Sequence, residues 1–303
     1  MSLASLSFRI AATIHDKKRD WGLKVDPTIR AHSDIQYGKS KKYNSLDIYY
    51  PKGTHEKLPV IVNFHGGGYV HGLKKNYIHY GMFLAKQGFV FVNPSYHLAP
   101  KKKYPTPLED LNQVMHWIAE NADTYYMDVS NLFIVGDSAG AQLAFQYSTM
   151  YTNPEYSKLF DFELPRTPVI QGIALNCGMY EIFKKMAALI KGEKVDADLE
   201  LIVLLKDYLG IDWKQYEEHF AVKDFVTERF PPTYLMTAEY DLLREEALPM
   251  YEALTKRGVK VTYKKFGEQG EEEYTHIFHC DMNLEEAKEA NREETRFFKS
   301  LLN

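Results

Sequence analysis

The sequence predicts an α/β fold in which a mostly parallel sheet is covered by helices on both faces. Two observations carry this prediction. Short apolar runs alternate with longer stretches of helix-forming residues through most of the chain, which is the pattern of strand–helix–strand units. Glycine-rich segments directly follow two of the apolar runs, as loops do at the carboxyl ends of parallel strands, where ligands bind.

The expected strands are short, apolar and of the kind that a buried parallel sheet needs. Two strands, at 31–37 and 46–50, precede the alternation and flank a polar turn at 38–42. The strands of the alternation are expected near 60–64, 89–93, 132–136, 170–175, 234–238 and 260–264. The helices are expected near 76–87, 107–122, 139–151, 244–257 and 283–302.

One stretch interrupts this alternation. Between Gly178 and Arg229 the sequence has helical patterns at 181–190, 196–209 and 213–220 and no convincing strand. An insertion of this size above the carboxyl edge of the sheet would form a lid or cap.

Composition excludes several classes of protein. A chain of 303 residues can bury a large core, and its net charge of −4 gives no reason to expect nucleic-acid or anionic-membrane binding. The apolar run 201–205 is far too short to span a bilayer, so we expect no stable membrane insertion. At the amino terminus the basic residues follow the apolar ones, which is the wrong order for a secretory signal. We therefore expect a cytoplasmic protein.

Neither the cysteines nor the acidic residues form a metal-binding pattern. The two cysteines, Cys177 and Cys280, have no ligand spacing and are expected to be buried or partly buried reduced thiols. The acidic run at 268–273 lacks the ordered spacing of a calcium loop and is expected to be a solvated loop. The sequence thus predicts no metal and no organic cofactor.

The segment Gly136-Asp137-Ser138-Ala139-Gly140 lies between an apolar run and a helix-forming stretch. A G-x-S-x-G motif in this setting is typical of a nucleophile elbow, a strained turn that exposes the serine hydroxyl above the sheet. The amides at the start of the following helix suit a developing negative charge. Ser138 is therefore the candidate nucleophile.

A second glycine motif, His65-Gly66-Gly67-Gly68, follows the apolar run 60–64. Three successive glycines bring bare backbone amides close to a ligand, as an oxyanion hole requires. Such a loop acts together with the amide of the residue after the nucleophile, here Ala139. Two uncommon motifs in the right order, each after its own strand, predict an acyl-transfer site.

A serine nucleophile needs a base, and the base needs a carboxylate that orients it. Where this nucleophile motif occurs, the serine is followed along the chain first by the acid and then by the histidine. Asp241 lies after Ser138 and just past the predicted strand 234–238. Its alternative role is a helix cap, and Glu239 and Glu245 are weaker candidates. For the base, His276 and His279 both follow the last predicted strand, and order alone does not choose between them.

With these motifs and the segments 95–100 and 241–245, the chain resembles the hormone-sensitive-lipase-like family of α/β-hydrolases from about Leu46 to its end. The family has His-x-Phe at the base, so the resemblance favours His276, with His279 as the alternative. It implies that the amides of Gly67, Gly68 and Ala139 form the oxyanion hole. It also implies that His65 and Gly66 support that loop.

The resemblance further implies a division of the chain into a catalytic domain and a cap. The family builds its cap from the amino-terminal segment and an insertion, so we expect a helical cap region of 1–30 and 178–228. The α/β-hydrolase catalytic domain is then 31–177 and 229–303. The sequence departs from the family at Ser95-Tyr96-His97, where Asp-Tyr-Arg is usual, and at Ile277, where glycine is usual.

The sequence therefore predicts a serine carboxylic-ester hydrolase that acts through a Ser138–His276–Asp241 triad and an acyl-enzyme. The expected partner is a small-molecule ester with an acetyl or a short- to medium-chain acyl group, and a homodimer is left open. Two alternatives remain. One is an amidase or peptidase with the same triad, and the other is a non-catalytic small-molecule-binding protein on the same scaffold.

Overall fold

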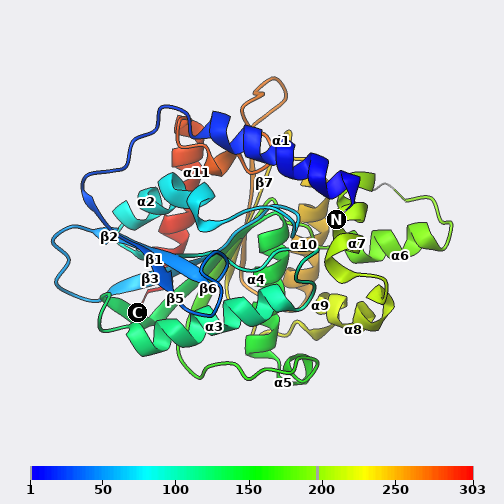
Figure 1. The fold of residues 1–303 in the computed structure, drawn as a ribbon, viewed down its shortest axis with the longest axis horizontal. Helices are drawn as coiled ribbons and strands as arrows, with labels where there is room; N and C mark the ends of the chain where they lie inside the picture. Colours follow the sequence, from blue (N-terminus) through cyan, green and yellow to red (C-terminus); the bar gives the residue numbers. More distant parts are fainter. Residues whose placement is uncertain (1, 196–197, 303) are drawn as a thin grey trace.

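The computed structural model describes residues 2–195 and 198–302 of the chain. Its centre is an eight-stranded sheet with the order β1-β2-β4-β3-β5-β6-β7-β8 (Figure 1). The first two strands pair antiparallel, as do β2 and β4, and every other neighbouring pair is parallel. The mostly parallel sheet that the sequence predicts is confirmed.

Each expected strand is present, with small shifts at its ends. The strands are β1 (Ile29–Gln36), β2 (Ser45–Pro51), β3 (Leu58–Phe64), β4 (Val90–Pro94), β5 (Met127–Asp137), β6 (Ile170–Asn176), β7 (Thr233–Ala238) and β8 (Val261–Phe266). The largest difference is at β5, which begins five residues before the apolar run from which it was predicted. Its polar first half extends beyond the buried part, so hydrophobic pattern alone does not detect it.

The helices outside the stretch between β6 and β7 also follow the expectation. They are α2 (Ile78–Lys86), α3 (Thr106–Asn121), α4 (Ala139–Thr152), the short α5 (Pro154–Ser157), α10 (Arg244–Lys256) and α11 (Glu285–Lys299). The expected helix 76–87 begins with a 3-10 turn at Lys74–Tyr77, and the one at 283–302 is shorter at both ends.

Alternating side chains along the strands supply a core on each face of the sheet. On one face, Ile61 and Phe133 pack with α2 and α11. On the other, Val62 and Ile134 pack with α3, α4 and α10. Because a strand points successive side chains to opposite faces, a nearly continuous apolar run is needed where both faces are covered.

The stretch between β6 and β7 is helical throughout its described residues. It contains α6 (Ile182–Ile190), α7 (Leu199–Leu209), a 3-10 turn (Trp213–Tyr216), α8 (Glu217–Phe220) and α9 (Val222–Phe225). The predicted helix 196–209 includes positions 196–197, which lie outside the described residues. At the other end of the chain, α1 (Leu3–Arg19) runs along the outer edge of the molecule and contacts α7 (Figure 1).

The carboxyl-terminal helix α11 packs against the sheet through Phe298. Its ring is fully buried, stacks on Phe133 with a centroid separation of 4.5 Å and meets Phe89 edge-on. We expect Phe298→Ala to lower the free energy of unfolding in urea by about 3–5 kcal/mol because it leaves a cavity. The control Leu248→Ala, at an exposed position of α10, should change it by about 0.5 kcal/mol or less. Equal effects of the two variants would contradict this role for α11.

Candidate active site

The sheet places both glycine motifs side by side. Strands β3 and β5 are parallel neighbours, with Phe64 opposite Gly136, so the residues that follow each strand share one edge of the sheet. Ser138 comes directly after β5 and opens α4, with φ 52° and ψ −118°. A positive φ is rare for a residue with a side chain and marks a strained turn of the kind that the motif predicts.

Gly140 must be glycine because the start of α4 lies against the end of β3. A Cβ atom at this position would stand 1.8 Å from the carbonyl oxygen of Phe64. Gly136 is similarly close to α4, since its Cβ would stand 2.5 Å from the carbonyl oxygen of Gly140. These contacts fix the distance between the serine turn and the loop that begins at His65.

Two amides of the glycine loop have no acceptor within the described residues. Among the described residues, neither Gly67 N nor Gly68 N donates a hydrogen bond to a protein group. Ala139 is the first residue of α4, so its amide has no acceptor within the helix. Gly67 has φ 109°, and a Cβ there would meet the carbonyl oxygen of His71 at 2.3 Å.

The other two residues of the glycine motif hold the loop. Gly66 N donates to Asp137 Oδ1 (3.0 Å) and to the Tyr77 hydroxyl (2.9 Å), which itself donates to Asp137 Oδ2 (2.9 Å). His65 is fully buried and stacks on Tyr96 with a centroid separation of 3.9 Å. Burial raises the pKa of Asp137 to about 6, although its hydrogen bonds favour the ionised form.

Asp241 and His276 form a close pair. His276 Nδ1 lies 2.6 Å from Asp241 Oδ1, and Asp241 also accepts from Leu243 N (2.9 Å) and Thr237 Oγ1 (2.8 Å). Burial by itself would raise the pKa of Asp241, but the hydrogen bond from His276 and the others lower it. The N-cap residue of α10 is Leu243, and Asp241 Oδ1 accepts from its amide in the turn that leads into the helix.

An isolated parallel bridge between Tyr240 and Thr275 joins the two loops that carry this pair. Ile277, the residue after His276, has φ 54° and ψ 27°, the left-handed region that a β-branched residue rarely adopts. This conformation explains why the related family usually has glycine here. The sequence also differs from the related family at His97. Its Nδ1 lies 2.7 Å from Asp110 Oδ2, so this side chain has a partner of its own.

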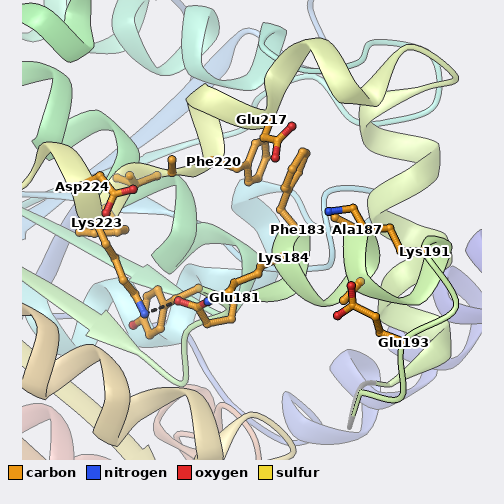
Figure 2. A pocket seen from close by; sticks show the side chains of 15 residues that line it. Glu181, Phe183, Lys184, Ala187, Lys191, Glu193, Glu217, Phe220, Lys223 and Asp224 are labelled. Carbon is orange, nitrogen blue, oxygen red and sulfur yellow. Dashed lines mark hydrogen bonds and ion pairs between the residues drawn. The ribbon is translucent and has the colours of Figure 1, made fainter.

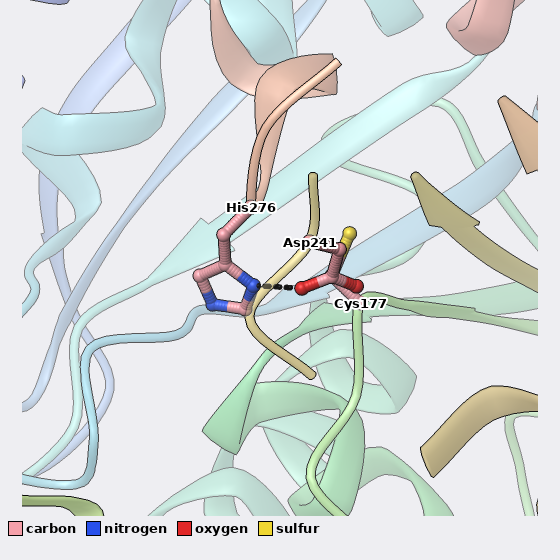
Figure 3. A group of neighbouring side chains, drawn as sticks. All are labelled: Cys177, Asp241 and His276. Atoms are coloured by element: carbon pink, nitrogen blue, oxygen red, sulfur yellow. Dashed lines mark hydrogen bonds and ion pairs between the residues drawn. The ribbon is translucent and has the colours of Figure 1, made fainter. Parts of the chain in front are cut away.

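Cys177 lies beside the pair, and its thiol, an Asp241 oxygen and a His276 nitrogen lie within 4.8 Å of one another (Figure 3). Burial, followed by the nearby Asp241 charge, raises the pKa of the Cys177 thiol well above its usual range. A metal needs the thiolate, and the carboxylate already accepts hydrogen bonds. The donor chemistry therefore favours a hydrogen-bonded pair over a metal site. Both cysteines are buried and free, as predicted.

His279 lies away from the pair. It is buried against Tyr80, with ring centroids 5.5 Å apart, and its carbonyl oxygen accepts from Asn291. Burial lowers the pKa of His279 to about 3. This neutral ring is part of the core between the sheet and α11. Glu239 and Glu245, the weaker candidates for the acid, bind Arg244 instead.

A small cavity of about 100 Å³ is lined by several of the predicted site residues. Ser138, His276, Gly67 and Gly68 line it together with residues of α1 and α7, including Phe8 and Leu201. Ser138 and His276, both within the described part of the chain, are not joined by a direct hydrogen bond here. Such contacts often tighten only when substrate binds.

A larger cavity of about 460 Å³ lies between α6 and the short helices α8 and α9 (Figure 2). Its wall combines Phe183 and Phe220 with an ion pair between Glu181 and Lys223. None of the predicted site residues lines this cavity, whereas Ser138, His276 and the glycine loop line the smaller one.

A buried network behind the serine was not predicted. Ser138 N donates to the Asn176 carbonyl oxygen (2.9 Å), and Asn176 Nδ2 donates to Glu294 Oε2 (2.6 Å). The Tyr80 hydroxyl donates to the other Glu294 oxygen (3.2 Å). The sequence gives no signal for Glu294, since the other glutamates of α11 are half-buried or exposed. It gives none for the partners of Asp137 either, which lie far along the chain.

The chain belongs to the alpha/beta hydrolase fold family, which matches residues 61–279. Among curated proteins it is similar to the versiconal hemiacetal acetate esterase of Dothistroma septosporum, with 29% identity over 72% of this chain and 67% of that protein. It is also similar to a carboxylesterase of Mycobacterium tuberculosis, with 27% identity over 71% and 66%. The chain thus spans about two thirds of the length of these relatives.

Among solved structures, esterase B of Lactobacillus rhamnosis has the same fold. The TM-score is 0.86 at 22% identity, over 98% of this chain and 95% of that one. The predicted family, fold class and enzyme class, a serine hydrolase of the carboxylesterase type, are therefore confirmed. No described helix has the length and hydrophobicity that spanning a bilayer requires.

Glu294 makes stability depend on pH. Burial raises the pKa of Glu294 to about 7 in the folded protein, above its usual 4.5. Between these values the folded state holds a proton that the unfolded state has released, so stability falls as pH rises. Relative to Glu294→Gln, the wild type should lose about 2–3 kcal/mol of unfolding free energy between about pH 5 and pH 8.

Urea unfolding of both proteins across this pH range measures the difference. Glu285→Gln, at an exposed position of α11, is the matched control and should keep the wild-type pH dependence. Parallel pH profiles for wild type and Glu294→Gln would show that Glu294 is ionised in the folded protein, contrary to this expectation.

Proposed function

We propose that this protein hydrolyses small acetyl and short-chain acyl esters through Ser138, His276 and Asp241. The observation that carries the proposal is the 2.6 Å pair between His276 Nδ1 and Asp241 Oδ1, on the same cavity as Ser138 and the glycine loop. The names of the two curated relatives, an acetate esterase and a carboxylesterase, support the same chemistry.

In the proposed mechanism, His276 takes the proton of the Ser138 hydroxyl while Ser138 Oγ attacks the acyl carbonyl. Asp241 accepts from Nδ1, so Nε2 is left as the basic nitrogen, and the carboxylate stabilises the imidazolium that forms. His276 then protonates the leaving alcohol. A water molecule, deprotonated by His276, attacks the acyl-enzyme and releases the acid.

The oxyanion of each tetrahedral intermediate would accept from the amides of Gly67, Gly68 and Ala139. These amides are free in the described structure, whereas that of Gly66 is used by Asp137 and Tyr77. Gly66 and His65 thus act as supports of the loop. A donor held in place before reaction is worth about 10²–10³ in turnover.

We also propose that residues 1–30 and 178–228 form the cap over a catalytic domain of 31–177 and 229–303. The support is that α1 and α7 together supply Phe8 and Leu201 to the wall of the cavity. The cavity is small, at about 100 Å³. This size favours an acetyl or short acyl group over a long chain.

The triad is tested by replacing its members separately. We expect Ser138→Ala and His276→Ala each to lower kcat for p-nitrophenyl acetate by about 10⁴–10⁶ because the groups act as a unit. His279→Asn, which changes the buried histidine that the sequence left open as the base, should retain most activity if folded. Retained activity in Ser138→Ala would refute the mechanism.

Labelling with a fluorophosphonate distinguishes the enzyme from a binding protein. A folded wild type whose Ser138 stays unlabelled would favour the non-catalytic alternative. A parallel assay with p-nitroacetanilide tests the amidase alternative, since the same machinery cleaves amides.

Substrate size is tested at Phe8. We expect Phe8→Ala to raise kcat/KM for the p-nitrophenyl decanoate ester relative to that for the acetate ester by about tenfold, because the smaller side chain enlarges the cavity. Ile10→Ala, on the outward side of the same helix, is the control and should leave the ratio unchanged. A ratio that responds equally to both changes would mean that Phe8 does not limit the acyl chain.

A further inference from the structure

Helix α1 has two faces with different environments. Its inner face contributes Phe8, Ala12 and Asp16 to the wall of the small cavity. Polar contacts fix this face: Asp16 Oδ2 accepts from His71 Nε2 (2.8 Å) and Asn76 Nδ2 (2.7 Å). Since the inner face is held in this way, the opposite face of the helix must point away from the protein.

That outer face is apolar. Leu6, Ile10 and Ile14 follow one another at intervals of four residues and therefore lie in one row along the helix. The side chains of Ile10 and Ile14 are 55% and 63% exposed. Just beyond the helix end, Trp21 is 83% exposed and Val25 is 60% exposed. An exposed apolar row of this length marks an interaction surface.

The charges that border this row are positive. Lys17 and Lys18 lie in the last turn of α1 and Lys24 follows Trp21, and all three are exposed. Over the described ranges 2–195 and 198–302, none of these lysines has a carboxylate within 4 Å.

The acidic residues of the same segment are already paired. Asp20 and Asp16 both contact Arg19, at 2.8 and 3.4 Å, and Asp26 contacts Lys86 at 2.9 Å. The segment therefore presents apolar side chains and uncompensated positive charge together.

We propose that the outer face of α1, with Trp21 and Val25, docks this protein onto the surface of a lipid bilayer that contains anionic lipid. A helix with an apolar row, basic residues and a tryptophan at its end is suited to lie in the plane of a bilayer surface. Lysines near anionic headgroups add attraction, and tryptophan is favoured at the interface.

The net charge of −4 does not oppose this docking. Exposed charges are screened beyond about 8–10 Å at physiological salt, so the local positive cluster decides the interaction with a nearby surface. Because the inner face of α1 lines the small cavity, docking would bring that cavity close to the lipid surface. The docking itself does not require that the protein hydrolyse esters.

The test is sedimentation of the full chain with vesicles of phosphatidylcholine alone or with about a third phosphatidylserine. We expect wild type to bind the anionic vesicles, and brominated lipid to quench tryptophan fluorescence in wild type more than in Trp21→Phe. Ile10→Gln/Ile14→Gln should abolish binding. The triple change Lys17→Ser/Lys18→Ser/Lys24→Ser should weaken it on the order of 100-fold.

Leu248→Gln, at an exposed apolar position on α10, is the matched control and should bind like wild type. Circular dichroism and hydrolysis of a water-soluble ester establish that each variant is folded. Wild type that stays in the supernatant with anionic vesicles would overturn the proposal. So would a dimer by light scattering that Ile10→Gln/Ile14→Gln converts to a monomer without any vesicle binding, because the apolar row would then belong to a second copy.

Discussion

The close approach between the end of β3 and the start of α4 is the constraint on which the site depends. At Gly140 the helix backbone nearly touches the carbonyl oxygen of Phe64, and any side chain there would push the two elements apart. The strain at Ser138, with its positive φ, is tolerated because strand and helix are both held by packing on either side. Serine turn and glycine loop are therefore rigid relative to each other before substrate arrives.

Asp137 fixes the position of the glycine loop relative to the serine turn. It is the last residue of β5, directly before Ser138, and its two carboxylate oxygens accept from the Gly66 amide and the Tyr77 hydroxyl. The motif residue next to the serine thus acts on the opposite loop. On the other side, the Asn176 carbonyl oxygen accepts from the Ser138 amide, and the Asn176 side chain donates to Glu294. Buried hydrogen bonds of this kind favour one arrangement of the turn, although Asn176 Oδ1 has no hydrogen-bond partner within the described residues.

Helix α1 links the site to the exterior. One face supplies Phe8 to the cavity wall, and the other carries Ile10 and Ile14 into solvent. In the two proposals made for this helix, its inner face limits the acyl group and its outer face meets the lipid surface. Its charge cluster is local, which is why a judgement from net charge alone did not reveal it.

The sequence by itself determined the order of strands and helices and the places of the serine turn and the glycine loop. These follow from local patterns, namely apolar runs of strand length and glycines where backbone must approach closely. It could not separate His276 from His279, because both occupy the required loop. Only the tertiary structure turned one ring toward Asp241 and buried the other against Tyr80. Likewise, Glu294 and the partners of Asp137 were decided by contacts across the sheet, since residues far apart in the chain meet only when the strands pair.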